Sequence, residues 1–281
     1  MQNRSFTVDN ACAGMTLAAF LERQLALSGR KAKALIDQRR VFVGRRRVWM
    51  ARHPLQAGDR VEIAGLSETP PHAATSIPSP RILVEADDLL IVDKPAGWLA
   101  NGPGSVEERL CSERDEKGIA AVHRLDRDTS GCLLLARGPE AEAMLTALFK
   151  QRQIEKLYEA IARGRCSGKQ RTLRQPIEGR AAISHLKVID AGPVASHLQI
   201  RIETGRTHQI RKHLAGIHHP IVGDPTYGPR REAQPLLRSA GRQMLHAAGL
   251  RFTHPVTGKK VQARAALPAD FRRMLQRLGL R

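Results

Sequence analysis

Cysteine and acidic residues are scarce in this chain, and long apolar runs are absent. The four cysteines form no C-x-x-C pair, so the sequence indicates neither a disulfide framework nor a zinc site. No run approaches the roughly 18 apolar residues of a membrane span, and the amino-terminal stretch lacks the apolar centre of a signal peptide. We therefore expect a cytoplasmic protein.

Positive charge, by contrast, is abundant. Lys and Arg number 46 against 27 Asp and Glu, which gives a formal net charge of +19. A folded chain with this imbalance repels itself unless a polyanion is near. Nucleic acid is the first candidate, an anionic membrane surface is the second, and a generally basic composition with no bound polyanion is the third. Because no amphipathic basic helix of convincing length is present, we expect no binding to a membrane. We expect a monomer that binds nucleic acid.

The length of 281 residues exceeds that of a usual single domain. Proline, serine and threonine crowd residues 66–80, and apolar periodicity disappears there, so this stretch is predicted to be a linker. It separates a small piece, residues 1–65, from a large piece, residues 81–281.

Helical and strand patterns follow one another in the small piece. Apolar residues at helical spacing predict helices over residues 16–25 and 32–36. Residues 41–43 and 61–63 predict strands, and a Gly-Asp turn precedes the second of them.

Basic residues form a band in the small piece, and no acidic residue lies between Arg39 and Arg47 to pair with them. A solvated helix face would mix the two signs, so we favour a phosphate-binding surface over that alternative. The residues expected to contact phosphate are Lys31, Arg39, Arg40, Arg45 and Arg46.

The small piece resembles the S4 RNA-binding domain. The likeness lies in the helix around residues 34–36, the strand at 41–43, and the stretch 55–61 with its Gly-Asp turn. Such domains often carry Asn-Gly after the strand, whereas this chain has Gly44 followed by three arginines, so the contacts of this loop with RNA are expected to differ. The resemblance implies a small α/β module that binds RNA.

Short apolar runs dominate the large piece. Strands are predicted over residues 82–84, 89–92, 131–136, 157–162, 186–189 and 197–203, and helices over residues 140–151 and 207–215. Because the strands outnumber the helices, the predicted fold class is α+β, with a mixed sheet and flanking helices.

A polar loop at residues 123–131 is the strongest local signal. It reads His-Arg-Leu-Asp-Arg-Asp-Thr-Ser-Gly and abuts an apolar strand, which is where catalytic groups concentrate. The alternative is a charged turn, but the cluster of one histidine, two arginines and two aspartates exceeds what a turn needs. A protein kinase is excluded, because Leu125 interrupts the His-Arg-Asp pattern and no Asp-Phe-Gly motif follows. No P-loop pattern occurs either.

A second polar motif spans residues 204–214. Thr207 can cap the amino end of the predicted helix, and His208 and Arg211 lie three residues apart on neighbouring parts of one face. Five histidines occur between His208 and His246, but no His-Glu-x-x-His pattern or carboxylate with ligand spacing accompanies them. We therefore expect no metal and no cofactor, and histidines that contact RNA or fill polar niches.

The large piece resembles the RluA family of pseudouridine synthases. The motifs that carry the likeness are residues 89–97, 123–131, 156–160, 205–213, 245–247 and 252–258. Residues 123–131 match the family signature H-R-L-D-x-x-T-S-G at every fixed position, and residues 205–213 match G-R-T-H-Q-I-R-x-H. Asn101 stands where relatives commonly have histidine, so substrate contacts there are expected to differ. The resemblance implies a mixed, mainly antiparallel sheet and an enzyme that flips a uridine out of RNA and isomerises it to pseudouridine.

The resemblance also implies roles for single residues. Asp126 would be the catalytic carboxylate, either as nucleophile at C1′ or as base at C2′, and Asp128 is the alternative. Arg211 would hold the catalytic carboxylate in a bidentate fork and keep its pKa low. The ring of Tyr158 would stack on the flipped base and its hydroxyl would assist proton removal from C5; the alternative is an ordinary strand aromatic.

Three further side chains are expected to contact RNA. Arg124 resembles the residue that enters the RNA in place of the flipped base. Arg206 and His208 are expected to shape the site and bind the RNA backbone.

Several functions stay open from the sequence. Large-subunit ribosomal RNA is the favoured substrate, because an S4 domain is typical of the ribosomal-RNA members, and transfer RNA is the alternative. A non-catalytic RNA-binding or ribosome-assembly protein would use the same basic surface, but it needs no positioned Asp126, Tyr158 and Arg211. An enzyme of DNA or of free nucleosides is a third hypothesis. The S4-like domain disfavours free nucleosides, because a small substrate needs no such clamp, and loss of binding on removal of 2′-hydroxyls would distinguish RNA from DNA.

Overall fold

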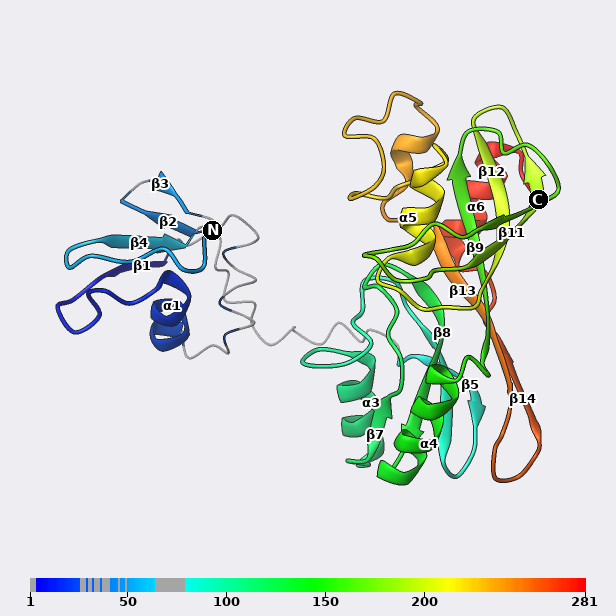
Figure 1. Cartoon of the computed structure of the whole chain (residues 1–281), viewed down its shortest axis with the longest axis horizontal. Helices are drawn as coiled ribbons and strands as arrows, with labels where there is room; N and C mark the ends of the chain where they lie inside the picture. Colours follow the sequence, from blue (N-terminus) through cyan, green and yellow to red (C-terminus); the bar gives the residue numbers. More distant parts are fainter. Residues whose placement is uncertain are drawn as a thin grey trace. The chain divides into compact units, whose positions relative to one another are not determined.

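The computed structural model describes residues 4–25, 29, 32, 36, 41–44, 46–48, 50–63 and 79–281. The chain divides into two compact units, Met1–Ile77 and Pro78–Arg281 (Figure 1). The predicted linker, residues 66–80, lies outside the described residues except for its last two.

The amino-terminal unit contains a helix, α1 (Leu17–Leu25), and a four-stranded antiparallel sheet in the order β1-β4-β2-β3. Its strands are β1 (Arg4–Thr7), β2 (Val41–Val43), β3 (Arg46–Arg47) and β4 (Arg60–Ile63). The predicted first helix and the strand at 41–43 are confirmed. The buried face of α1, with Leu17, Phe20 and Leu21, packs into one hydrophobic cluster with strand residues such as Val61.

The large unit is built on one ten-stranded sheet. Its main path runs β10-β11-β12-β9-β13-β8-β6-β5, while β14 pairs with β13 and β7 pairs with β8. The strands are β5 (Arg81–Glu85), β6 (Leu89–Lys94), β7 (Ile119–Ala121), β8 (Ser130–Arg137), β9 (Glu155–Arg163), β10 (Gln170–Leu173), β11 (Ser184–Ala191), β12 (Ala195–Ile202), β13 (Leu245–Thr253) and β14 (Lys260–Arg264). Only β8 and β13 pair in parallel among the described strands, so the expected α+β fold with a mixed, mainly antiparallel sheet is confirmed.

The parallel contact between β8 and β13 depends on a glycine. Gly131 has φ +110°, and a Cβ atom there would lie 2.2 Å from the carbonyl oxygen of Ala247. No other residue permits this approach without moving the backbone of β13. The polar loop ahead of β8 is thereby brought to the middle of the sheet.

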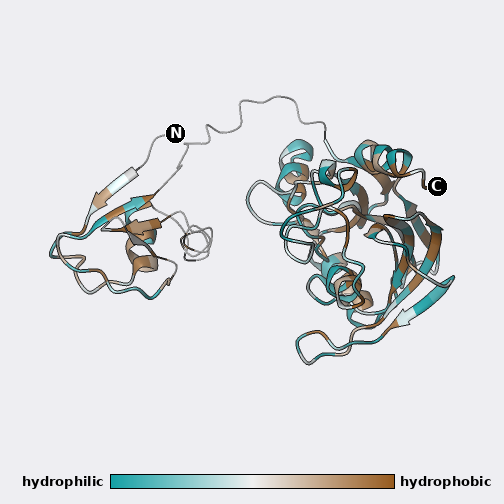
Figure 2. Ribbon diagram, turned by 90° about the horizontal axis from the view of Figure 1, so that it is seen from above, coloured by the Kyte–Doolittle hydropathy of each residue, from teal (hydrophilic) through white to brown (hydrophobic). Residues whose placement is uncertain are grey.

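Helices flank the sheet and complete its hydrophobic clusters. They are α3 (Val106–Arg114), α4 (Pro139–Lys150), α5 (Gln209–Gly216), α6 (Ala269–Leu278) and a short 3-10 helix, η1 (Leu237–Ser239). Strands β6 and β8 are buried along nearly their whole length, and hydrophobic residues mark the strands of this unit while the helices carry hydrophilic stretches (Figure 2).

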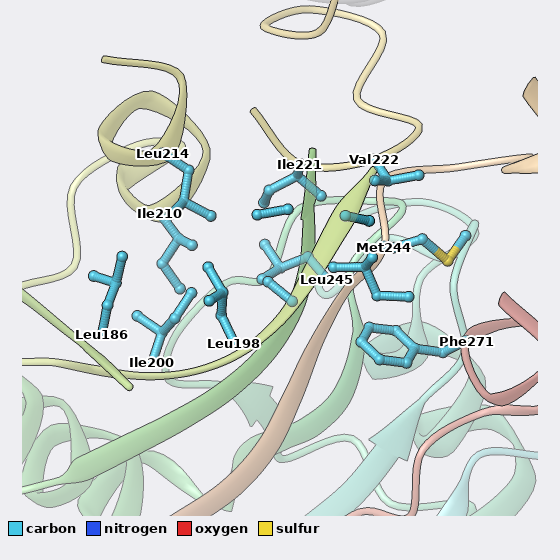
Figure 3. Packing of buried hydrophobic residues seen from close by; sticks show 14 of the residues in the cluster. Leu186, Leu198, Ile200, Ile210, Leu214, Ile221, Val222, Met244, Leu245 and Phe271 are labelled. Carbon is cyan, nitrogen blue, oxygen red and sulfur yellow. The ribbon is translucent and has the colours of Figure 1, made fainter. Parts of the chain in front are cut away.

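Helix α5 is held on the sheet by its apolar face. Ile210 and Leu214 point from α5 towards Leu186, Leu198 and Ile200 on β11 and β12 (Figure 3). This packing fixes the helix that carries the second polar motif. None of the helices within the described ranges is long and apolar enough to cross a membrane.

Candidate active site

The loop at residues 123–129 leads directly into β8. The Thr129 N–H donates to the carbonyl of Asp126 at 3.0 Å, which closes a tight turn around the carboxylate. Leu125, next to it, is buried in a hydrophobic cluster with Leu133 and Leu135 of β8. The turn is therefore anchored on the sheet immediately beside Asp126.

Two buried cations hold the loop backbone after Asp126. Lys94 is fully buried at the end of β6, and its Nζ donates to the carbonyl of Arg127 at 2.9 Å and to two carbonyls of the turn after β6 at 2.8 and 2.9 Å. Arg242 Nη1 donates to the carbonyl of Asp128 at 2.9 Å. Burial, and then the charge of Arg242, lower the pKa of Lys94 to about 7.

His123 holds the other end of the loop. Its Nε2 accepts a hydrogen bond from the backbone N–H of Leu134 at 3.0 Å, and its ring stacks on Phe149 with 4.6 Å between centroids. Burial, and then the charge of Lys156, lower the pKa of His123 to about 3. The imidazole is therefore neutral near pH 7, as an acceptor must be.

Arg211 lies between two carboxylates. Its Nη1 donates to Asp126 Oδ2 at 3.0 Å, while its Nε and Nη2 donate to the two oxygens of Asp224 at 2.7 and 2.9 Å. The predicted contact between Arg211 and Asp126 is present, but the prediction of a bidentate fork on Asp126 is wrong. The fork lies on Asp224, because the approach of Arg211 from α5 presents only one N–H to the loop.

Asp224 is fully shielded, with 0% of its side chain exposed. Burial opposes its ionisation, but hydrogen bonds from Arg211 and from the backbone N–H groups of Tyr227 and Thr226 outweigh that effect and lower the pKa of Asp224. A charged Asp224 therefore fixes the guanidinium that reaches Asp126.

His208 lies on the other side of Asp126. Its Nε2 is 3.7 Å from Asp126 Oδ1, and its Nδ1 is 3.0 Å from the hydroxyl of Tyr227. Burial lowers the pKa of His208, against the opposing charge of Asp126. His208 and Arg211 thus lie beside the same carboxylate, one from the residue before α5 and one from its first turn.

The amino end of α5 differs from the prediction. The helix begins at Gln209 after His208, which has φ +55°, and Thr207 is exposed and does not cap it. Instead, Gln209 Oε1 accepts hydrogen bonds from the Arg206 N–H at 3.1 Å and from the Thr204 hydroxyl at 2.7 Å. These contacts tie the stretch before α5 to its first residue, and no side chain of the described residues caps the amino end of the helix.

A cavity of about 120 Å³ opens over Asp126. Its lining includes every residue predicted for the catalytic and RNA-binding roles in the large piece, namely Arg124, Asp126, Tyr158, Arg206, His208 and Arg211. These residues come from β9, from the loop before β8 and from the start of α5. Asp128, the alternative carboxylate, is not among the lining residues contributed by the described range 79–281.

Tyr158 forms one wall of this cavity. It is half-buried on β9 and packs against two different hydrophobic clusters, one under α5 and one under β8. Burial, and then the charge of Asp126, raise the pKa of Tyr158. Its hydroxyl is therefore protonated near pH 7.

The two arginines at the rim differ in how they are held. Arg124 is exposed, whereas Arg206 is half-buried and its Nε donates to the carbonyl of Ala181 at 3.2 Å. Across the described ranges, no group of three or more His, Cys, Asp or Glu residues is arranged to hold a metal ion.

Comparison with known proteins gives this geometry a context. Residues 88–216 match the family model of RNA pseudouridylate synthases. The chain is 36% identical to ribosomal large subunit pseudouridine synthase D of Xanthomonas campestris pv. campestris, over 81% of this chain and 78% of that protein. It is 31% identical to ribosomal large subunit pseudouridine synthase C of Vibrio vulnificus, over 96% of this chain and 95% of that protein.

The chain belongs to the RluA family of RNA pseudouridylate synthases. The fold agrees, because the solved structure of human RNA pseudouridylate synthase domain containing 4 superposes with a TM-score of 0.62 at 22% identity, over 72% of this chain and 94% of that one. The resemblance read from the motifs is thereby confirmed, and with it the activity of an isomerase that converts uridine in RNA to pseudouridine.

The phosphate contacts predicted for the amino-terminal unit stay a prediction. Lys31, Arg39, Arg40 and Arg45 lie outside the described residues, and Arg46 falls in the short strand β3.

Sequence analysis of this pseudouridine synthase missed three residues that organise the site. Asp224 follows Gly223 in a turn, and its position 13 residues after Arg211 gave no periodic signal. Lys94 was part of a Lys-Pro turn and Arg242 was one of many arginines. Burial is the signal that distinguishes them, and it becomes visible only in the folded sheet.

Proposed function

We propose that this pseudouridine synthase modifies a uridine of large-subunit ribosomal RNA, with Asp126 as the carboxylate that acts on the ribose. The observation that carries the proposal is the position of Asp126 in the cavity, with 22% of its side chain exposed. One carboxylate oxygen accepts a hydrogen bond from Arg211. The other is 3.7 Å from His208 Nε2, beyond hydrogen-bond distance, and is left for the substrate.

The reaction breaks the N1–C1′ bond and forms a C5–C1′ bond, so substrate and product are isomers. The bonding electron pair leaves with the uracil, the base turns, C5 attacks C1′, and the C5 proton is lost while N1 gains one. Asp126 either bonds to C1′ during the rotation or removes the proton from C2′. In both routes Arg211 orients the carboxylate of Asp126 towards the ribose, and Asp224 fixes the orientation of Arg211.

Tyr158 is placed to contact the base. Its ring forms a wall of the cavity, and stacking on an aromatic face is a sequence-tolerant way to hold a flipped base. Its raised pKa makes the hydroxyl a hydrogen-bond donor at neutral pH, so help with C5 proton removal requires the hydroxyl to pass on its own proton. Arg124, exposed at the rim, is the side chain assigned to the gap that the flipped base leaves.

The choice of RNA rests on charge and on relatives. The formal net charge of +19 fits a polyanionic partner such as RNA. The two bacterial relatives described above are named for the large ribosomal subunit, and the likeness to the Vibrio vulnificus protein covers 96% of this chain. We assign the amino-terminal unit to RNA binding as an S4-like domain with basic contacts at Lys31, Arg39, Arg40, Arg45 and Arg46, in a cytoplasmic monomer.

Pseudouridine mapping on total cellular RNA tests this proposal. Cells that lack the gene would carry the wild-type chain, Asp126→Asn, or Asp128→Asn as the matched control from the same loop. We expect sites in large-subunit ribosomal RNA to lose pseudouridine in the deletion and with Asp126→Asn, and to regain it with the wild-type chain and Asp128→Asn.

Other outcomes would change the assignment. Restoration by Asp126→Asn but not by Asp128→Asn would exchange the two carboxylates. Loss confined to transfer RNA would replace the substrate and leave the chemistry intact. A deletion that alters no site in any RNA would favour a non-catalytic role in RNA binding.

A further inference from the structure

A second cavity, of about 500 Å³, opens beside the catalytic one. Arg124, Tyr158 and Arg206 line both cavities, so one continuous ligand can occupy the two together. The larger cavity, called here the basic hollow, is bounded by the end of α4, by β9 and by the loop after β12. Its volume is in the range of sites that take small-molecule groups.

The hollow is strongly basic. Its charged lining residues are Arg124, Lys150, Arg152, Lys156, Arg206 and one acid, Glu203. Glu203 is already engaged outside this set of basic groups, because its Oε1 lies 2.6 Å from His185 Nε2. The electrostatic character of the hollow therefore favours an anion.

Lys156 is the residue that points to a ligand. It is only 6% exposed, yet no hydrogen bond or ion pair joins its ammonium to any residue in the described ranges. The nearest feature is the ring of Phe149, with 5.9 Å from Nζ to the centroid. Its ammonium lines the hollow, and among the described residues its nitrogen is not one of the fully shielded atoms that lack a partner. Lys94, which binds three carbonyls, shows how this chain holds a purely structural lysine.

Arg152 adds a second positive charge close to Lys156 in the chain. Arg152, in the turn between α4 and β9, has φ +60°, a left-handed conformation that favours glycine. The chain keeps an arginine there, and Arg152 lines the hollow. Its charge contributes to the lowered pKa of Lys156, after burial, so the two cations repel each other until an anion lies between them.

We propose that the basic hollow binds the phosphate of a nucleotide adjacent to the target uridine, with Lys156 as the direct phosphate contact. This inference rests on the proposed function, because it places the strand that enters the catalytic cavity. Tyr158 and Lys156 lie two residues apart on the same face of β9. A strand whose uridine stacks on Tyr158 therefore brings a neighbouring phosphate to the Lys156 ammonium.

The test compares full-length wild type with Lys156→Gln, and with Lys260→Gln as the matched control from β14, outside both cavities. Without RNA, we expect Lys156→Gln to melt at the same temperature as wild type or higher, because the substitution breaks no hydrogen bond or ion pair within the described residues. On a large-subunit ribosomal RNA transcript we expect KM to rise about tenfold with kcat retained. The slope of log affinity against log salt should become shallower by about one counterion, and Lys260→Gln should behave as wild type.

Three results would overturn the inference. A lower melting temperature of Lys156→Gln with unchanged KM would make Lys156 a structural residue. Loss of kcat with KM unchanged would assign it to the chemistry instead. If Lys156→Gln weakens binding of inorganic phosphate but not of a twelve-residue oligouridylate, the hollow is a site for free anions.

Binding measurements distinguish a failure of the proposed function from a failure of the phosphate site. If the wild-type chain isomerised no uridine in any RNA, the comparison of oligouridylate affinities would still decide the question. Equal affinities of Lys156→Gln and Lys260→Gln would then reject the phosphate site, and weaker binding by Lys156→Gln alone would retain it.

Discussion

Asp224 accepts two of the N–H groups of Arg211, at 2.7 and 2.9 Å, and leaves a third to reach Asp126 at 3.0 Å. The pair is almost fully enclosed, with 5% of the arginine side chain and 0% of the aspartate side chain exposed. The strong, bidentate contact with Asp224 thus fixes the position of Arg211, and its single contact with Asp126 is directed to the cavity.

Removal of Asp224 should damage both stability and activity. Asp224→Ala leaves the buried guanidinium with only Asp126 and the Thr226 hydroxyl as partners among the described residues, so we expect a loss of about 3–5 kcal/mol in the free energy of unfolding. We expect kcat to fall by about 10²-fold or more, because Arg211 loses its orientation. Chemical denaturation and single-turnover isomerisation measure the two effects. The matched control is Glu178→Gln, which breaks the exposed pair with Lys212 and should change neither quantity. An Asp224→Ala enzyme with wild-type kcat would show that Arg211 needs no such support.

Two glycines with left-handed backbone allow a paired test of the contact between β8 and β13. A Cβ at Gly131 would lie 2.2 Å from the Ala247 carbonyl oxygen, whereas a Cβ at Gly138, with φ +97°, meets no atom within 4 Å. Gly138→Ala should therefore lose only about 1–2 kcal/mol through backbone strain. Gly131→Ala should lose about 1–3 kcal/mol more through overpacking, measured by urea denaturation. Equal losses in the two variants would mean that β13 can move away at no penalty.

His123 should make the enzyme sensitive to acid. Its pKa is about 3 in the folded chain against 6.5 as the ordinary value. The folded state therefore binds fewer protons than the unfolded state between these values, and the stabilising effect is complete above pH 6.5 and declines as the pH falls towards 3. We expect the melting temperature of wild type to fall more steeply between pH 6.5 and pH 4 than that of His123→Gln. Parallel curves for the two proteins would contradict the neutral, hydrogen-bonded imidazole.

Tyr158 should separate binding from proton transfer. Tyr158→Phe keeps the ring, so we expect RNA affinity close to wild type and a kcat lower by about 10²–10⁴-fold if the hydroxyl takes part in general acid–base chemistry. Tyr158→Leu removes the stacking face, and affinity should fall by about tenfold or more. Steady-state kinetics with equilibrium binding measures both, with melting curves to verify that each variant folds. Unchanged affinity in Tyr158→Leu would reject stacking on this ring.

Local patterns in the sequence predicted much of the large unit. The strand at 131–136 and the helix at 140–151 appear as β8 and α4 with ends shifted by one residue, because apolar runs and helical spacing report burial directly. Helix α6 was not predicted although Phe271, Met274 and Leu275 have helical spacing, since four charged residues alternate with these apolar positions. Strand β13 escaped because its Ala-Ala-Gly run lacks strong strand formers and its pairing with β8 joins residues 116 positions apart.

In the active site, too, motifs of neighbouring residues were predictable, whereas contacts between residues far apart in the chain were not. The motifs brought Asp126, Arg211 and Tyr158 together correctly, since each lies in a distinctive polar stretch. The number of hydrogen bonds that Arg211 gives to each carboxylate could not be read from spacing, because Asp224 competes for the same guanidinium from a buried turn. Thr207 was expected to cap α5 from its residue type alone, but the helix begins after His208 and has no side-chain cap from the described part of the chain.

The 85 positions that separate Asp126 from Arg211 in the chain have a consequence for biosynthesis. At translation rates of about 5–20 residues per second, the carboxylate leaves the ribosome several seconds before its arginine. Tyr158 packs against both hydrophobic clusters that meet at the cavity, and one of them includes Leu214 of α5. A nascent chain therefore carries an incomplete site. We expect it to be inactive towards the RNA of the ribosome that synthesises it until the last strands and helices have packed.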